Sequence, residues 1–265
     1  MDALSCPSVD FFVHIDRKVG NMPELTASNG SELFFIKDRV DTRWGDVSQI
    51  RTELALVEGA IHPGKYSFYH IISGTHFPIK PVEDILAYYD SFTGNTVLDH
   101  LCQSTATQEG LKLRRVNLFT RRLGHGSHGS RRIFQRAWRM GHDVQKMLGI
   151  SLHGEVSFYK AANWVSLSEE AAAMLVSRRK DILRLFRWSF CGDEYFVPTM
   201  LLGSELRDKV VDSERILMQE MGDANPRVLT MADYETLASS DCLFARKFSG
   251  RHIDVVDRIA ADIRK

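Results

Sequence analysis

The sequence has no excess of charge and no long apolar run. Its 265 residues include 34 lysines and arginines and 34 aspartates and glutamates, so its formal net charge is zero. No global field therefore favours nucleic acid, an anionic membrane or an acidic partner, and recognition must be local. No run approaches the roughly 18 to 20 apolar residues of a membrane helix, and no signal peptide is evident. We expect a soluble, cytoplasmic chain whose membrane contact is at most peripheral.

Cysteines are few and metal-binding motifs are absent from the sequence. The four cysteines form neither a CxxC pair nor a ligand cluster, so we expect free thiols in a reducing compartment. There is no Asp-x-Asp motif, and the nearest approach, Asp233-Tyr-Glu235, is expected on the solvated face of a helix. His14 and Asp16 alternate on a strand without a third ligand, which argues against a metal site. We predict no metal and no other cofactor.

No repeat, low-complexity tract or linker divides the chain, so we predict a single domain over residues 1–265. Strand patterns at 9–15 and 68–72 flank a helical pattern at 47–57, whose apolar residues recur at intervals of three and four. This order is typical of a βαβ unit and predicts an α/β fold with a largely parallel sheet. Further strands are predicted at 33–36 and 96–101, and further helices after Pro81 and at 168–176, 181–188 and 253–263.

An arginine-rich stretch runs from Arg114 to Arg139 around a segment at 124–129 that its glycines predict to be flexible. Such a run is usually a solvated face, although it could bind an anionic or phosphate-bearing acceptor such as a lipid-linked glycan. The stretch contains no recognisable RNA-binding module, and few aromatic residues are interleaved with its arginines. We therefore expect no nucleic-acid partner.

Six short segments, in order, resemble those of a known family. They are FVHIDRK at 12–18, RWG with Ser48 at 43–48, SGTHFPIK at 73–80, NWVSLS at 163–168, DEYF at 193–196 and LFARKF at 243–248. The ordered set resembles the core-2/I-branching β-1,6-N-acetylglucosaminyltransferase family, which also contains peptide O-xylosyltransferases. The likeness is to a bacterial-type member with a short N-terminus, whereas eukaryotic relatives are Golgi membrane proteins.

The resemblance implies a GT-A-like nucleotide-sugar-binding fold with a central, mostly parallel sheet flanked by helices. Residues 1–110 would form a nucleotide-binding βαβ part, and residues 111–265 an acceptor-binding and catalytic part. The implied reaction is an inverting, metal-independent transfer of N-acetylglucosamine or xylose from a UDP-sugar donor. The implied acceptor is a hydroxyl of a glycan, a glycolipid or a protein.

An inverting transfer needs a carboxylate that takes the proton of the acceptor hydroxyl and positive charge at the departing diphosphate. The resemblance assigns the base to Glu194 and the positive charge to Arg227 and Lys247, with Arg246 as an alternative cation. Glu194 follows an expected turn and precedes a helix with Pro198 in its first turn, so its carboxylate can project into a cleft. The alternative is that Asp193 and Glu194 only offset the helix dipole.

The remaining candidate residues concern the two sugars and the nucleoside. Asp16 ends the first strand, where ligands gather in α/β sheets, and the resemblance assigns it to the uridine. Asp99 matches an acidic residue that holds the acceptor sugar, and Trp164 could stack on that sugar. The alternatives are a strand-end cap for Asp99 and a core position for Trp164. His76 stands where many relatives have an aspartate, which leaves the contacts of the donor sugar open.

A second hypothesis is of another class. Relatives begin with a strand and a helix before the segment that matches Met1–Pro7, and that strand helps to form their nucleotide site. A chain without it would be a non-catalytic nucleotide- or carbohydrate-binding remnant that lacks the first core strand.

Overall fold

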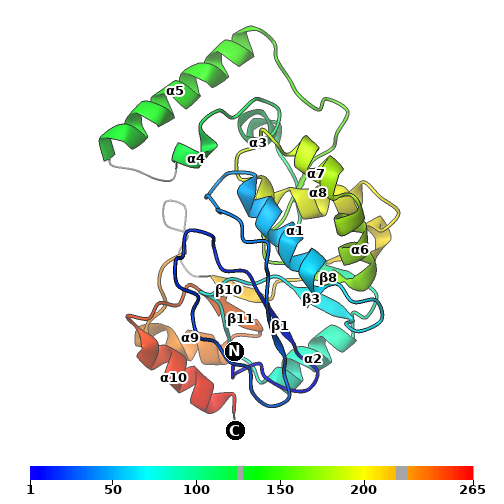
Figure 1. Cartoon of the computed structure of the whole chain (residues 1–265), viewed down its shortest axis with the longest axis vertical. Helices are drawn as coiled ribbons and strands as arrows, with labels where there is room; N and C mark the ends of the chain where they lie inside the picture. The colour runs from blue at the N-terminus through cyan, green and yellow to red at the C-terminus, as the bar shows by residue number, and fades with distance from the viewer. Residues whose placement is uncertain (124–127, 219–225, 265) are drawn as a thin grey trace.

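The computed structural model describes residues 1–123, 128–218 and 226–264 (Figure 1). The elements are β1 (Phe11–Val13), β2 (Leu33–Phe35), α1 (Ser48–Ala60), β3 (Phe68–His70), β4 (Phe77–Pro78), α2 (Val82–Asp90), β5 (Thr96–Leu98), β6 (Cys102–Gln103), α3 (Ala106–Lys112), α4 (Thr120–Leu123), α5 (His128–Met147), β7 (Tyr159–Lys160), β8 (Ser166–Ser168), α6 (Glu169–Ser177), α7 (Arg179–Leu185), the short 3-10 helix η1 (Gly192–Glu194), α8 (Phe196–Leu202), η2 (Arg207–Lys209), β9 (Val210–Asp212), β10 (Ile216–Met218), η3 (Met231–Asp233), α9 (Tyr234–Ser239), β11 (Phe244–Arg246) and α10 (Ile253–Asp262).

The strands form four small sheets of mixed direction. The largest has the order β3-β8-β5-β9, with β8 antiparallel to both β3 and β5 and with β5 parallel to β9. The sheet β10-β11-β4 contains one parallel and one antiparallel pair, while β1 and β2 are parallel and β6 and β7 antiparallel. The predicted α/β class is confirmed, but the described residues do not form one central, mostly parallel sheet. Apolar alternation specifies the buried face of a strand, whereas its partner and direction depend on the rest of the fold.

Helix α1 shows how the sequence pattern becomes packing. Ile50, Leu54 and Val57 are at most 3% exposed, and burial of each such side chain is worth about 1.5–3 kcal/mol. The helix contacts α6, α7 and η1, so its apolar stripe supports the corner of the fold at which Glu194 lies. The predicted helix at 47–57 is thus confirmed and extends to Ala60.

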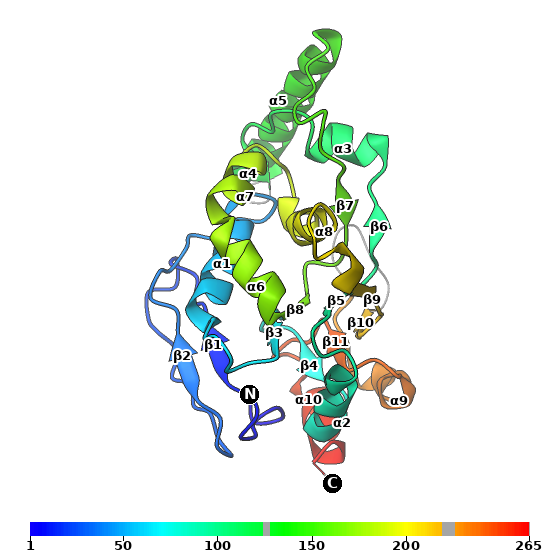
Figure 2. The same cartoon turned by 90° about the vertical axis from the view of Figure 1, so that its right-hand side faces the viewer.

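Two groups of helices lie against the sheets. In Figures 1 and 2, α1, α6, α7 and α8 lie together near β3 and β8, and their side chains contribute to the largest hydrophobic cluster. Helices α9 and α10 pack beside β11 over a second cluster at the opposite end. No helix among the described residues is long and apolar enough to span a bilayer. The division at residue 110 stays a prediction.

The turn before Glu194 is closed by tight packing at Gly192. Cys191 has a left-handed backbone with φ of 53°, and the N–H of Tyr195 donates to the carbonyl of Gly192 at 3.0 Å. Helix α8 then begins with Pro198 in its first turn, where proline costs no intrahelical hydrogen bond. The predicted turn and helix start are therefore confirmed.

Replacing Gly192 by alanine should destabilise the fold. The added Cβ would lie 2.3 Å from Ser189 Oγ and 3.2 Å from carbon atoms of Ile50 and Phe186, which is overpacking. We expect a loss of about 1–3 kcal/mol in the free energy of unfolding, measured by urea denaturation. Gly141→Ala is the control, because nothing lies within 4 Å of its added Cβ and alanine favours the helix α5. Equal losses in the two variants would contradict the packing argument.

Candidate functional site

The carboxylate of Asp193 joins three of the six sequence segments. Its Oδ2 accepts hydrogen bonds from Gln49 Nε2 at 2.8 Å and from Asn163 Nδ2 at 3.1 Å. The side chain of Gln49 in turn accepts from the backbone N–H of Gly45. The residue before the candidate base is therefore fixed both to α1 and to the segment that leads into β8.

Glu194 itself lies at an accessible corner between two lysines. Its Oε2 is 2.9 Å from Lys112 Nζ and 3.6 Å from Lys160 Nζ, and its side chain is 32% exposed. Its backbone carbonyl accepts from the N–H of Ala161 at 2.9 Å, so the main chain at this position is tied down. Burial opposes the charge of Lys112, but the neighbouring carboxylate raises the pKa of this ammonium above its ordinary value. The arrangement neutralises the carboxylate without covering it.

Both lysines were missed by the sequence analysis. Lys112 ends α3 and Lys160 ends β7, and neither lies in one of the six segments. Only the fold brings them to Glu194, because the three residues come from separate parts of the chain. The sequence carries no signal that would have selected them from the other lysines.

Two buried carboxyl groups lie behind Glu194. Asp193 Oδ1 and Glu53 Oε2 are buried and have no hydrogen-bond partner among the described residues. Burial, followed by the charge of Glu194, raises the pKa of Asp193 to about 6. Burial and the charge of Asp193 raise the pKa of Glu53 well above its ordinary value. Asp193 therefore does more than offset a helix dipole, since its buried carboxyl group hydrogen-bonds Gln49 on α1 and Asn163 before β8.

Trp164 brings three further parts of the chain together. Its ring lies 4.8 Å from that of His76 in an edge-on arrangement, and Arg246 Cζ lies 5.0 Å from the indole centroid. The backbone N–H of Phe248 donates to the carbonyl of Thr75 at 2.9 Å, which closes the same corner. Trp164 is half-buried and packs against the hydrophobic clusters, as expected for a core aromatic. Its contact with an acceptor sugar stays a prediction.

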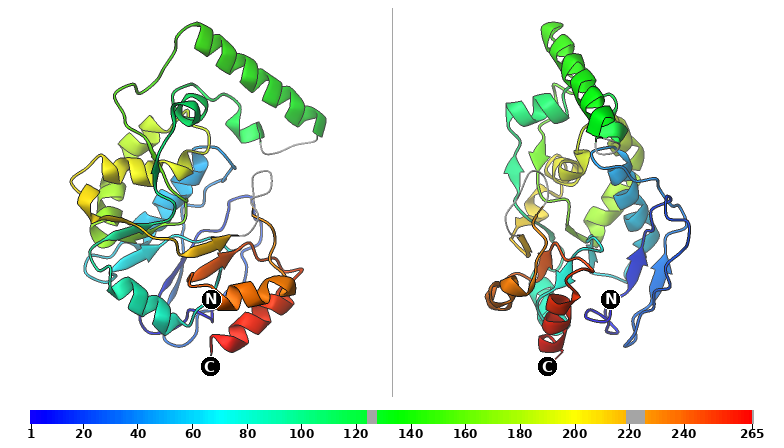
Figure 3. Two further views of the ribbon diagram at one scale, coloured as in Figure 1. Left: turned by 180° about the vertical axis from the view of Figure 1, so that it is seen from behind. Right: turned by 90° about the vertical axis from the view of Figure 1, so that its left-hand side faces the viewer.

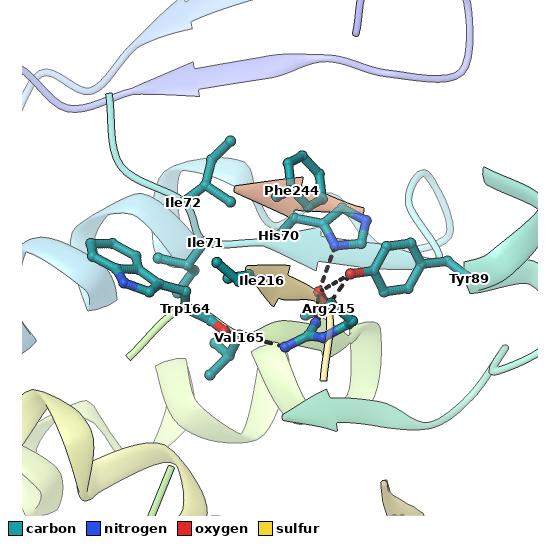
Figure 4. Close-up of a pocket in the computed structure, with 10 residues that line it drawn as sticks. His70, Ile71, Ile72, Tyr89, Trp164, Val165, Arg215, Ile216 and Phe244 are labelled. Carbon is teal, nitrogen blue, oxygen red and sulfur yellow. Dashed lines mark hydrogen bonds between the residues drawn. The ribbon is translucent and has the colours of Figure 1, made fainter. Parts of the chain in front are cut away.

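Asp99 is buried in an ion pair. Arg215 Nε donates to Asp99 Oδ1 at 2.6 Å, and the two side chains are 2% and 1% exposed. The same guanidinium donates to Tyr89 Oη at 3.1 Å and to the carbonyl of Trp164 at 3.3 Å, beside a small pocket that His70 also lines (Figure 4). In this arrangement Asp99 holds Arg215, and Arg215 holds the backbone of Trp164. A role of Asp99 toward the acceptor stays a prediction.

The two cations assigned to the diphosphate lie on adjacent backbone segments. The N–H of Leu229 donates to the carbonyl of Lys247 at 2.8 Å. Arg227 makes a two-pronged ion pair with Asp233, with N···O distances of 2.9 and 2.6 Å, and this pairing lowers the pKa of Asp233 to about 2. Lys247 is half-buried as a residue, and its ammonium forms no ion pair with any described residue.

Asp233 is not on a solvated face, so that expectation was wrong for this residue, whereas Glu235 is exposed as expected. Thr230 and Asp233 form a capping box at the start of η3, in which each side chain hydrogen-bonds the backbone of the other residue. Asp233 is only 6% exposed. Within the described ranges, no three His, Cys, Asp or Glu side chains gather as a metal site. Independence of a metal stays a prediction.

Asp16 lies in a turn just after β1. Lys18 donates to it from its backbone N–H at 2.9 Å and from Nζ at 3.0 Å. Burial raises the pKa of Asp16, but these hydrogen bonds outweigh it and lower the pKa below the ordinary value. Lys18 also approaches Asp41, which pairs with Arg43 at 2.8 Å, so the first segment meets the second. All six segments thus belong to one connected set of contacts.

The raised pKa of Asp193 predicts a pH dependence of stability. Because the folded state favours the protonated acid, this contribution is fully present below the ordinary pKa of 3.8 and is lost as the pH rises through about 6. The loss corresponds to about 3 kcal/mol. Asp193→Asn should flatten the pH dependence of chemical unfolding between these two values, with Asp181→Asn at an exposed position of α7 as the control. Parallel curves for Asp193→Asn and the unchanged chain would contradict the assignment.

Comparison with known proteins gives one family. A family model described as Core-2/I-Branching enzyme matches residues 2–227, which is well over half of the chain. The match includes Asp16, Glu194 and Arg227 and ends before the segment that contains Lys247. No curated protein matches the chain. With five of the six connected segments inside the matched range, the chain belongs to the core-2/I-branching enzyme family, a family of glycosyltransferases.

Proposed function

We propose that this glycosyltransferase moves N-acetylglucosamine, or xylose, from a UDP-sugar to a hydroxyl of a glycan, glycolipid or protein. The transfer inverts the anomeric centre and needs no divalent metal, and the fold is a variant of the GT-A type. The observation that carries the proposal is the carboxylate of Glu194, which is accessible, held by its backbone and flanked by two ammonium groups. Glu194 directly follows Asp193, whose carboxylate joins three of the six sequence segments.

The proposed chemistry is a single displacement. Glu194 accepts the proton of the acceptor hydroxyl while the hydroxyl oxygen forms a bond to the anomeric carbon of the donor. The bond from that carbon to the diphosphate breaks on the opposite side, and UDP leaves with the electron pair. Lys112 hydrogen-bonds Glu194 Oε2 at 2.9 Å, and Lys160 Nζ lies 3.6 Å from the same oxygen, so both ammonium groups are placed to donate to the incoming sugar.

The leaving diphosphate needs positive charge that is not already engaged. Lys247 fits this need, because its ammonium has no ion-pair partner among the described residues. Arg227 is engaged by Asp233, so a phosphate would bind beside this pair or compete with it. Arg246 covers the indole of Trp164 and is the weaker alternative cation. Asp16 is proposed to contact the uridine.

The acceptor is proposed to lie on the Trp164 side of Glu194. Asn163 connects the two, because it precedes Trp164 and donates to Asp193. Asp99 would act there through Arg215, which fixes the backbone carbonyl of Trp164 at 3.3 Å. A sugar that stacks on the indole would then meet the carboxylate of Glu194 from a fixed direction.

Glu194→Gln should abolish transfer while donor binding persists. The amide keeps the size of the side chain but cannot take a proton, so kcat should fall by about 100-fold or more. Turnover is measured as UDP release in a screen of several UDP-sugars against an acceptor panel, and binding is measured by calorimetry with UDP. Glu205→Gln, a change of the same kind outside the site, is the control. Unchanged transfer in Glu194→Gln would remove this residue from the mechanism.

Lys247→Gln should weaken binding of UDP and of the donor by about tenfold or more, because a charge-assisted hydrogen bond to phosphate is lost. Lys180→Gln, at an exposed position of α7, is the matched control and should bind normally. EDTA should leave the turnover of the unchanged chain as it was. Turnover that requires a divalent ion, or equal UDP affinity in both variants, would refute this part of the proposal.

The screen also separates the enzyme from the remnant hypothesis. A non-catalytic remnant binds UDP or a UDP-sugar in calorimetry and yet releases no UDP with any donor and acceptor pair. Turnover that depends on Glu194 would exclude it.

A further inference from the structure

The described side chains that join helix α5 to the rest of the molecule lie on one face of the helix. Trp138 Nε1 and His142 Nε2 both lie 2.9 Å from Asn117 Oδ1. Gln145 pairs with the backbone of Val116 in both directions, at 2.8 and 3.1 Å. These residues follow at helical spacing, so they define one side of the helix. The helix runs along one end of the molecule, away from the sheets (Figures 1 and 3).

A second face of α5 is apolar and exposed. Its side chains are Ile133, Met140, Val144 and Met147, with exposed fractions of 69%, 63%, 49% and 79%. Intervals of seven, four and three residues place them in one stripe along the helix, which Leu148 continues beyond its end at 64% exposure. Burial of such side chains is the norm in a folded protein, so an exposed stripe of this length marks an interaction surface.

A third face of α5 is basic and lies along the apolar stripe. Its exposed cations are Arg132, Arg136, Arg139 and Lys146. At 100° per residue, these four positions fall on the side of the stripe that is opposite to the packed face. Asp143 is the acidic residue among them. Local positive charge therefore accompanies the apolar stripe although the whole chain is neutral.

We propose that α5 docks flat on an anionic lipid bilayer, with the apolar stripe in the interface and the basic face toward lipid phosphates. An interfacial helix has this division between an apolar stripe and a cationic flank, which provides both buried area and attraction to anionic headgroups. A second copy of the chain is the competing occupant. Antiparallel pairing of two such stripes would bring the basic faces of both copies close together, which like charges oppose, and parallel pairing would leave both basic faces without an anionic partner.

The test is sedimentation of the full chain with vesicles of phosphatidylcholine, alone or containing about 30% phosphatidylglycerol. The unchanged chain should bind the anionic vesicles and release them at high salt. The double variant Met140→Gln with Met147→Gln should bind about a hundredfold more weakly, because two apolar side chains no longer enter the interface. Met22→Gln with Met231→Gln is the matched control, since these methionines are 43% and 42% exposed elsewhere.

The double variant Arg136→Gln with Arg139→Gln tests the contribution of the basic face to vesicle binding. Each arginine contributes about fivefold to the affinity for anionic lipid, so the loss of both should weaken binding by about twenty-five-fold. Arg184→Gln with Arg251→Gln, both exposed and outside α5, is its control. Circular dichroism verifies that every variant is folded.

Three results would overturn the proposal. The first is the absence of binding to anionic vesicles. The second is an equal loss of binding in the stripe variant and in its methionine control. The third is a concentration-dependent dimer, seen by light scattering, that the stripe variant dissociates while vesicle binding is absent. Neither readout depends on sugar transfer, so the result does not hinge on the function proposed above.

Discussion

The position of Glu194 depends on a single carboxyl group, that of its neighbour Asp193. One oxygen of Asp193 receives amide donors from Gln49 on α1 and from Asn163 before β8, while the other is buried without a partner in the described part of the chain. A buried polar atom left unpaired costs free energy, and a buried charge costs more unless it is compensated. The fold tolerates this cost where α1, η1 and the segment before β8 meet. A residue next to such a tie has little freedom to move its backbone.

The buried acids also shape the electrostatics around Glu194. Asp193 and Glu53 both have raised pKa values, so the folded state favours their neutral forms and reduces the negative charge behind the exposed carboxylate. Lys112 and Lys160 then supply positive charge on the accessible side. An interior that prefers neutral acids and a rim that carries ammonium groups give Glu194 an environment unlike that of an ordinary surface glutamate.

Local features of the fold could be predicted from the sequence, but its long-range pairings could not. The helical period gave α1, and the turn before Pro198 placed Glu194 just ahead of α8. The family segments were recognisable in order, and the family match confirmed them over residues 2–227. The predicted largely parallel sheet is not confirmed, because parallel and antiparallel pairs are mixed and a strand such as β8 has no pattern that tells a parallel partner from an antiparallel one.

Partners distant in sequence were equally hidden. Arg215 lies outside the six segments, yet it forms an ion pair with Asp99 and donates a hydrogen bond to the carbonyl of Trp164. Asp233 was expected in solvent and instead holds Arg227. In each case the sequence showed a charged residue but not its partner. The fold pairs residues that are far apart in the sequence, and no periodic pattern relates their positions. The same holds for the two lysines at Glu194.

The arginine-rich stretch is linked structurally to the candidate site. Asn117 is the residue on which the packed face of α5 rests, and its side-chain amide also donates to the carbonyl of Lys112 at 3.1 Å. Lys112 carries the ammonium that pairs with Glu194 at 2.9 Å. The support of the amphipathic helix and the support of the candidate base are therefore the same short segment. A displacement of α5 relative to the body of the molecule would strain its contacts with Val116 and Asn117, and through Asn117 the backbone of the lysine at the candidate site.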